Sequence, residues 1–289
     1  MTYRLAIGDR SYSSWSLRGW LFFDAFGIPV ECSHARLYTD QVAKLLTEFP
    51  PARTVPAMRT PDGTVVGDTA AIAEELASRH PDAGLWPADP AARATARMLA
   101  AEMHAGFSAL RAACPMNLRV SYVDCAPDDA VMADLARLQV IWAAARQITG
   151  CATPWLCGAY SAADAFFAPV AARVAGYGLP VDDAAAAYVA AHLAHPSFRR
   201  WRAMALVDGP DQAFYFRDYP RRPWPGPVPL AARAASGPSV NATCPYSDLP
   251  VAEYLEIGGR VFGFCNRFCR DKTEADPEAW PKFMEIYHS

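Results

Sequence analysis

The sequence lacks the features expected of a membrane-spanning, secreted or nucleic-acid-binding chain. No basic segment leads into a long apolar run at the N-terminus, so we expect neither a signal peptide nor a transmembrane helix. The net charge of −3 and the pI near 6.1 give no broad attraction for nucleic acid or for an anionic membrane. No internal repeat is present. These absences predict a cytoplasmic location and a small-molecule partner, with no nucleic acid and no membrane.

The composition that is present is typical of a globular protein. Hydrophobic residues make up 52% of the 289 residues and charged residues 20%, values that exclude a disordered chain. This length predicts two domains and a small accessory unit. Eight cysteines in a reducing compartment are more often buried apolar residues, metal ligands or redox thiols than disulfide partners. Their spacing must therefore decide their role.

The first 80 residues predict a small mixed sheet with helices on its faces. A βαβ opening is followed by a ββα segment whose hairpin turns at residues 61–63. The expected strands and helices are strand 3–7, helix 16–26, strand 30–36, helix 40–48, the hairpin and helix 69–79. This order of elements predicts a compact α/β domain over residues 1–80.

The rest of the chain divides into three parts by composition. Residues 90–206 are rich in alanine with helical periodicity, which predicts an all-α helical bundle after a proline-containing connection. Residues 207–242 are rich in proline, arginine and alanine without periodicity, which predicts a tether or a strap on the surface. Residues 243–289 then form a separate small unit.

Three N-terminal segments are candidates for a binding site. Residues 11–16 join the first strand to the first helix, where backbone N–H groups and the helix dipole favour an anion such as a thiolate. Val55-Pro56 precedes a strand, where a cis-proline would leave the Val55 backbone free to pair with a peptide-like ligand. Asp68 and Thr69 begin a helix and are suited to hold an amino-acid head group. The alternative for the serines and for Asp68-Thr69 is helix capping alone.

In this order and spacing, the segments SYSSWSLRGW, TVPAM and GDTAAIAEEL resemble the glutathione transferases, and the first resembles the serine-type classes, nearest to the zeta pattern. The resemblance covers about residues 1–206 and implies a thioredoxin-like domain followed by a helical domain. It implies a homodimer and glutathione as co-substrate. The residues that it assigns to the glutathione site are Ser13 or the adjacent Ser14 as donor to the sulfur, Val55 with Pro56 against the cysteinyl backbone, Asp68 and Thr69 at the γ-glutamyl end, and Arg53 at the glycyl carboxylate.

The sequence departs from the zeta pattern at two positions. Trp15 stands where zeta enzymes have cysteine, which weighs against maleylacetoacetate isomerase activity, and Thr54 occupies a position that is often basic. The expected chemistry is thiol activation without covalent catalysis by the protein. Lowering the thiol pKa by about two units requires about 2.7 kcal/mol, which one hydroxyl donor and a helix N-terminus can supply together.

The helical part offers candidates for an electrophile pocket. Residues 102–107 and 116–119 resemble a bacterial subgroup of the transferases, in which this first helix lines the pocket. The resemblance therefore implies that Met103, His104 and Phe107, with Tyr12, face the substrate. The alternative is that a methionine and aromatic stripe at helical spacing is core. Ser161 and Asp164 match a capping box, for which we take the structural interpretation.

The C-terminal unit carries three cysteines at a spacing that suits a soft metal. Twenty residues separate Cys244 from Cys265, and three more separate Cys265 from Cys269, around a hairpin that turns at Gly258-Gly259. Three thiols on a small ββα unit predict a site for zinc or copper(I), with Asp248 or His288 as candidate fourth ligand or an open position. The segment 244–284 resembles the YHS/TRASH-like modules. The alternative is an aromatic core around unoccupied thiols, made by Tyr254, Phe262, Phe264, Phe268 and Trp280.

Two classes of function follow. The leading hypothesis is a glutathione S-transferase that uses a serine hydroxyl to activate the thiolate for attack on a small electrophile. The alternative is a non-catalytic transferase-like scaffold whose C-terminal module binds or senses metal. A glutathione-dependent reduction through a protein thiol is disfavoured, because residues 11–16 contain no cysteine.

Overall fold

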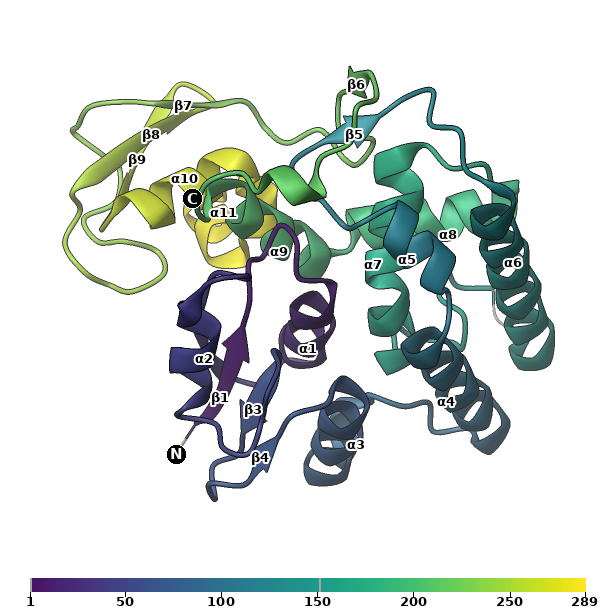
Figure 1. Ribbon diagram of the computed structural model, residues 1–289. Coiled ribbons are helices and arrows are strands. Elements are labelled where there is room, and N and C mark those ends of the chain that lie inside the picture. Colours follow the sequence, from purple (N-terminus) through teal and green to yellow (C-terminus); the bar gives the residue numbers. More distant parts are fainter. Residues whose placement is uncertain (1, 151) are drawn as a thin grey trace. The chain divides into compact units, whose positions relative to one another are not determined.

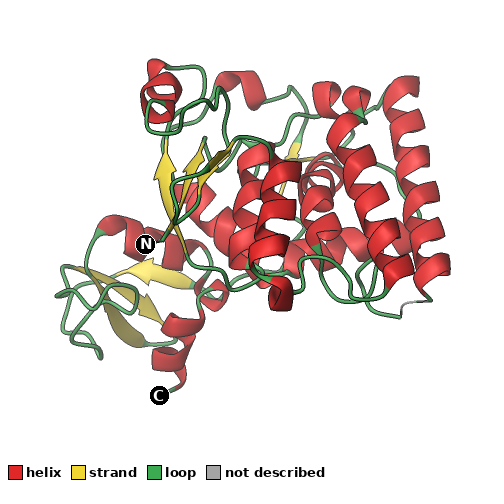
Figure 2. Ribbon diagram, turned by 90° about the horizontal axis from the view of Figure 1, so that it is seen from below, coloured by secondary structure: helices red, strands yellow, loops and turns green. Residues whose placement is uncertain are grey.

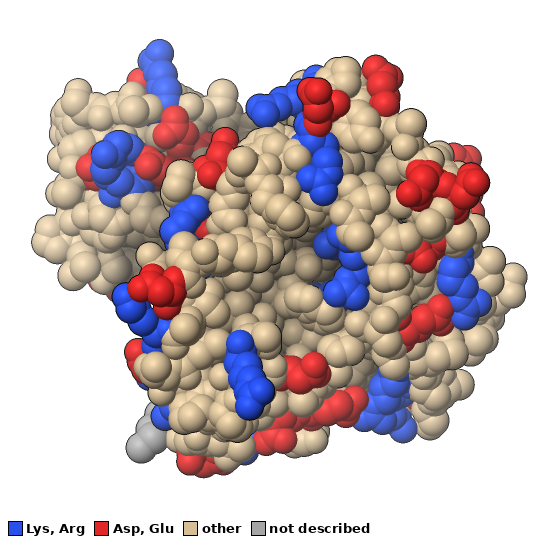
Figure 3. Space-filling view, in the orientation of Figure 1, with Lys and Arg blue, Asp and Glu red and all other residues tan. Residues whose placement is uncertain are grey.

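The computed structural model describes residues 2–150 and 152–289, which form two compact units. One unit runs up to Leu193 and also includes Asp211–Pro225; the other comprises Ala194–Pro210 and Gly226–Ser289. Among the described residues, no helix has both the length and the apolar character needed to cross a bilayer. Charged side chains of both signs are interspersed over the face drawn in Figure 3, without a continuous field of one sign.

The first unit begins with a four-stranded sheet in the order β2-β1-β3-β4. Its strands are β1 (Tyr3–Ile7), β2 (Val30–His34), β3 (Ala57–Arg59) and β4 (Val65–Val66). Strand β2 runs parallel to β1, whereas β3 is antiparallel to β1 and β4 is antiparallel to β3. The βαβ and ββα halves that the sequence predicted are therefore confirmed, in the arrangement of a thioredoxin-like domain.

Helices cover both faces of this sheet (Figure 1). Helix α1 (Ser14–Asp24) packs against α3 (Thr69–Arg79), and α2 (Asp40–Leu46) buries Leu46 with Phe49 against the other face. The sequence of α1 explains why this helix packs against the sheet: residues 20–23 are consecutive apolar residues, and all four are buried. The bounds of α1 lie two residues before the predicted ones at each end.

The helical part of this unit is centred on one fully buried helix. Its helices are α4 (Pro90–Ala105), α5 (Ser108–Ala113), α6 (Asp129–Thr149), α7 (Ala162–Tyr177) and α8 (Asp183–Ala194). Every residue of α7 is buried, and α7 packs against both α1 and α4. A helix that is apolar all round belongs in a core. The bundle of red helices in Figure 2 corresponds to the predicted helical domain.

The segment Asp211–Pro225 belongs to this first unit. It contains the 3₁₀ turn η2 (Ala213–Tyr215) and strand β6 (Arg221–Arg222), which pairs with β5 (Ser121–Tyr122). The prediction of a single linker over 207–242 is therefore wrong, because hydrogen bonds tie its first half to the first unit and its second half contains a strand of the other unit.

The second unit contains α9 (Pro196–Val207) and a three-stranded sheet with two further helices. Its other elements are β7 (Ala232–Ala234), β8 (Glu253–Ile257), β9 (Arg260–Phe264), α10 (Arg267–Ala275), η3 (Pro277–Ala279) and α11 (Pro281–His288). The predicted hairpin turn at Gly258-Gly259 is confirmed, and both glycines have positive φ, as a two-residue turn requires.

Two expectations for the second unit are corrected. Helix α9 was predicted to close the helical domain at residue 206, but it packs on α10 and η3, and Arg199 forms a bidentate ion pair with Asp276 at 2.6 and 2.8 Å. The sequence DKTEADPEAWPKFM after Cys269 predicts a loop followed by a short helix, but its first residues continue α10 to Ala275. Asn266 caps this helix by accepting a hydrogen bond from the Cys269 N–H at 2.9 Å.

Candidate functional site

The two candidate serines lie at the N-terminus of α1 but differ in their hydrogen bonds. Ser13 is the N-cap: its Oγ accepts from the Ser16 N–H at 3.3 Å and donates to Ser16 Oγ at 2.8 Å. Ser16 Oγ in turn accepts from the Gly8 N–H at 2.9 Å, which ties the helix start to the end of β1. Ser14 is the first helical residue, and within the described residues its hydroxyl forms no hydrogen bond. The Ser14 hydroxyl is therefore available to donate a hydrogen bond to a ligand.

Both serines open onto the main cavity of this unit, which has a volume of about 660 Å³. The cavity brings together five of the predicted site residues: Tyr12, Ser13, Ser14, Arg53 and Val55. Further lining residues that the sequence did not indicate are Leu37, Tyr38, Ser108, Arg111, Pro115, Met116, Arg173, Phe214 and Tyr215. The cavity is thus built from the sheet domain, the helical part and the segment after Asp211.

A smaller cavity of about 190 Å³ lies on the other side of Trp15 and Val55. Asp68 and Thr69 line it, as does His104. Asp68 caps α3 by accepting from the Ala70 N–H at 2.8 Å, and its other oxygen lies 3.3 Å from His104 Nε2. The capping interpretation is therefore correct for Asp68, and its second oxygen remains directed at the cavity.

The Val55-Pro56 peptide bond is cis, at the position where the sequence suggested it. The pairing of β3 with β1 begins at Ala57, so the backbone of Val55 lies outside the sheet ladder. Val55 and Pro56 line the small cavity, and Val55 also lines the large one. An extended ligand would therefore find unpaired backbone groups at this edge.

Two of the four predicted electrophile-pocket residues are core residues. Met103 is 0% exposed and the Phe107 ring is buried, and neither lines the two cavities described above. Met103 lies on the face of α4 that packs against α6 and α7. His104 faces the small cavity rather than the large one, and only Tyr12 lies where the prediction placed it.

Three arginines that the sequence analysis missed gather at the main cavity. Arg111 and Arg173 line it, and Arg18 is buried with its guanidinium 4.4 Å from the Trp15 ring centre. Arg111 lies 5.0 Å from the same ring centre. No aspartate or glutamate pairs with any of the three within the described chain. Of the three, Arg18 and Arg173 are buried, whereas Arg111 is partly exposed. Buried cations without an acidic partner are costly, which indicates a site prepared for a negative charge.

The buried arginines are held mainly by carbonyl groups. Arg173 donates to the carbonyls of Cys114 at 2.8 Å and Pro169 at 3.1 Å, and Arg18 donates to the Phe166 carbonyl at 2.9 Å. The Nη1 of Arg18 has no partner. Burial, and then the charge of Arg111, lower the pKa of Arg173 to about 10, so that it still carries its charge at neutral pH. The sequence signal that could have identified Arg173 as a source of positive charge at the cavity is its position inside the otherwise apolar stretch of α7.

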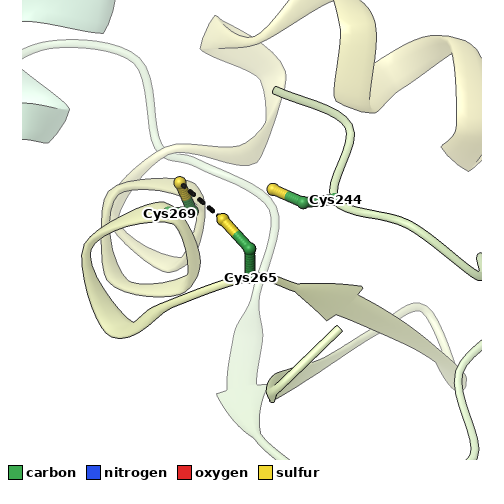
Figure 4. Close-up of side chains that lie close together, drawn as sticks. All are labelled: Cys244, Cys265 and Cys269. Carbon is green, nitrogen blue, oxygen red and sulfur yellow. Dashed lines mark hydrogen bonds between the residues drawn. The ribbon is translucent and has the colours of Figure 1, made fainter. Parts of the chain in front are cut away.

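In the second unit, the three predicted cysteines converge. The Sγ atoms of Cys244, Cys265 and Cys269 all lie within 4.8 Å of one another. Figure 4 shows the three thiols directed toward a common point from the loop before β8, the end of β9 and the first turn of α10. Cys265 also accepts from the Ser247 hydroxyl and the Asn266 amide, each at 3.2 Å.

Neither predicted fourth ligand joins this group. Asp248 and His288 lie outside the cluster of ligand atoms that the described residues form. Asp248 has φ of 58° in the turn after Cys244, where its N–H donates to the Cys244 carbonyl. The aromatic core surrounding the thiols includes Phe262, Phe264 and Trp280, as the alternative expected, but Phe268 is exposed. The chemistry of the donors fits a soft metal held by three thiolates with one open position.

The first unit combines a thioredoxin-like domain, which has a polar loop at a helix N-terminus and a cis-proline, with a helical part. Parts of its sequence, and its fold, are similar to those of glutathione transferases. Residues 12–79 match the family described as "Glutathione S-transferase, N-terminal domain". A "Probable maleylacetoacetate isomerase" of Caenorhabditis elegans is 34% identical over 111 residues, which is 38% of this chain and 48% of that protein. The chain thus matches about half the length of this curated relative.

Solved structures agree on the fold. A glutathione transferase homologue from Burkholderia strain BGR1, solved with bound glutathione, superposes with a TM-score of 0.53 at 22% identity, over 71% of this chain and 98% of that one. Glutathione transferase Omega 1C from Trametes versicolor gives 0.53 at 16% identity, over 69% and 90%. At these identities the likeness shows the fold, a thioredoxin-like domain followed by a helical part.

Proposed function

We propose that this protein is a glutathione transferase that ionises the thiol of bound glutathione at the N-terminus of α1 and directs the thiolate at a small, negatively charged electrophile. The observation that carries the proposal is the free hydroxyl of Ser14, which opens onto the same cavity as Val55 and the unpaired arginines. Transfer and glutathione-dependent isomerisation both begin with attack by this thiolate, so the proposal covers either outcome.

Glutathione would occupy the edge between the two cavities. The Val55 backbone is suited to pair with the cysteinyl unit, and the small cavity at Asp68 and Thr69 is suited to the γ-glutamyl ammonium. Arg53 lines the large cavity and is suited to the glycyl carboxylate. This placement directs the sulfur toward the serines and leaves the arginine side of the large cavity for the second substrate.

The geometry favours Ser14 over Ser13 as the donor to the sulfur. The resemblance to the family points to Ser13, but its hydroxyl proton is directed at Ser16, whereas Ser14 has a free hydroxyl in the cavity. We therefore assign Ser13 to the helix cap and Ser14 to the thiol. The exposed N–H groups of the first turn add their partial positive charge.

Ultraviolet absorbance of the thiolate during glutathione titration tests this assignment. The Ser14→Ala variant is expected to bind glutathione with the thiol pKa raised by about one unit relative to wild type, because one charge-assisted hydrogen bond is lost. The matched control is Ser13→Ala, which should lose about 1 kcal/mol of stability with a smaller change in the thiol pKa. An unshifted thiol pKa in the wild-type complex would contradict thiol activation and leave only the binding scaffold.

A second proposed function is metal binding by the three cysteines of the C-terminal unit. The convergence of three thiols within 4.8 Å favours it. Zinc or copper(I), held by thiolates, would stabilise this small unit, since such sites contribute binding energy directly to folding. Ser247 and Asn266 would support Cys265 by hydrogen bonds to its sulfur.

Metal analysis of protein purified without chelator is expected to give about one equivalent of zinc or copper per chain. The Cys265→Ser variant should lose most of this metal, because only two thiolates remain. Cys32→Ser is the control, since Cys32 lies in β2 outside the cluster. Less than about a tenth of an equivalent in wild type would reject the metal site.

A further inference from the structure

The segment Asp211–Arg217, here called the strap, contributes Phe214 and Tyr215 to the lining of the main cavity, and hydrogen bonds fix its first residues. The Gln212 N–H donates to the Tyr12 hydroxyl at 3.1 Å, and Gln212 Nε2 donates to Asp9 Oδ2 at 2.7 Å. Asp9 is buried, and the same oxygen accepts from the Leu37 N–H at 2.6 Å. The strap is therefore attached to the loop that carries the serines, about 200 residues earlier in the sequence.

Further contacts hold the rest of the strap on the helical part. Asp211 forms an ion pair with Arg119 at 3.0 Å, and the Tyr215 carbonyl accepts from Asn117 Nδ2 at 3.3 Å. The Arg217 N–H donates to the Tyr122 hydroxyl at 3.0 Å. The strap is thus attached both to the sheet domain and to the helical part. These attachments fix the strap as one wall of the cavity.

The strap places aromatic rings in the cavity. Tyr215 stacks on Tyr12 with ring centres 4.5 Å apart and 24° between the planes. Its hydroxyl lies 3.1 Å from the hydroxyl of Tyr38, and the Phe214 ring centre lies 5.9 Å from that of Tyr38. Tyr215 is buried, whereas Phe214 is 67% exposed and Tyr38 is 76% exposed. Two large rings side by side thus present uncovered surface at the cavity.

We propose that Phe214, Tyr215 and Tyr38 form an aromatic clamp that determines which electrophile this enzyme accepts. The planes of Phe214 and Tyr38 are inclined by 58° to each other. The clamp takes a planar aromatic or conjugated group, because such a group can stack on one of the two exposed rings and contact the other with its edge. Arg111 and Arg173 line the same cavity and take an acid group of the same molecule. The substrate class is therefore a planar aromatic or conjugated carboxylic acid. This inference rests on the proposed transferase function.

Calorimetric titration with two glutathione conjugates separates the clamp from the glutathione site. S-benzylglutathione carries an aromatic ring and S-methylglutathione does not. Wild type should bind the benzyl conjugate about tenfold more tightly than the methyl conjugate. In Phe214→Ala, this preference should nearly disappear, while the affinity for S-methylglutathione changes by less than about twofold. Because Phe214 is mostly exposed, its removal should leave the fold intact.

The control is Phe268→Ala, which removes another exposed phenylalanine in the C-terminal unit and should change neither affinity. If wild type binds both conjugates equally, or if Phe214→Ala weakens both to the same extent or neither, the clamp is refuted while the glutathione site stands. If wild type binds neither conjugate, the proposed function itself fails, and the clamp with it.

Discussion

Replacement of Asp164 by alanine is expected to lower the free energy of unfolding by about 4 kcal/mol. The carboxylate is 0% exposed and accepts from the Ser161 N–H at 2.9 Å, the Ser161 hydroxyl at 3.0 Å and the Tyr188 hydroxyl at 2.8 Å. It also accepts from the Leu156 N–H at 3.3 Å. Alanine leaves these donors buried without an acceptor, at a cost of about 1–3 kcal/mol for each that finds no substitute. Urea denaturation followed by circular dichroism measures the loss.

Asp128→Ala is the matched control for this change. Asp128 caps α6 by accepting from the Val131 N–H at 2.8 Å, but its side chain is exposed. Water can replace that single hydrogen bond, so the loss should be about 1 kcal/mol, as for an ordinary helix cap. Equal losses in the two variants would mean that Asp164 acts as a cap only, and that its contacts with Tyr188 and Leu156 add nothing to stability.

The N-terminal domain was accessible to prediction because its signals are local. Gly27 lies in the turn that follows the first helix, Pro61-Asp62-Gly63 turns the hairpin, and short apolar runs mark the strands. The capping box at Ser161 and Asp164 was likewise readable from four consecutive residues and is confirmed. The three cysteines of the second unit were predicted together because their spacing follows a hairpin and the next helix turn.

The residues that form the walls of the main cavity could not be predicted from the sequence, because they are brought together by contacts between distant segments. Phe214 and Tyr215 lie in a proline-rich stretch without periodicity, and contacts of this stretch with distant residues, such as the hydrogen bonds of Gln212, bring them to Tyr12. Conversely, Met103 carries no signal that distinguishes a pocket from a core position. Its burial is decided by the packing of α4 on its neighbours, which the sequence pattern of one helix cannot specify.

Helix α9 shows that a sequence pattern also does not determine which unit a helix packs on. The helical periodicity of residues 90–206 predicts helices, and α9 is one of them, with Phe198 and Trp201 on its buried face. The pattern does not say which partner covers the face. Here α10 and η3 do so, with Trp201 fully buried and Arg199 paired to Asp276. The choice of partner was set by residues about 77 positions away.

The second large effect is expected for Arg111→Met, which should weaken binding of S-(4-carboxybenzyl)glutathione by about tenfold to a hundredfold. Wild type is expected to prefer this conjugate over S-benzylglutathione, because Arg111 and Arg173 offer unpaired positive charge in the cavity. A hydrogen bond to a charged partner contributes about 1.5–3 kcal/mol, which matches this range. Binding of S-benzylglutathione should change little, and calorimetric titration of both conjugates measures the difference.

Arg137→Met is the control, since it removes an arginine that is paired with Glu102 and lies outside the cavity lining. The pH dependence provides a second check. Because the pKa of Arg173 is lowered to about 10, its charge is lost as the pH rises through that value, so the preference for the carboxylated conjugate should hold at pH 7–8 and fall toward pH 10. Equal affinity of wild type for the two conjugates at neutral pH would refute the anionic substrate, because the guanidinium groups of Arg111 and Arg173 would then not distinguish a carboxylate from a neutral ring.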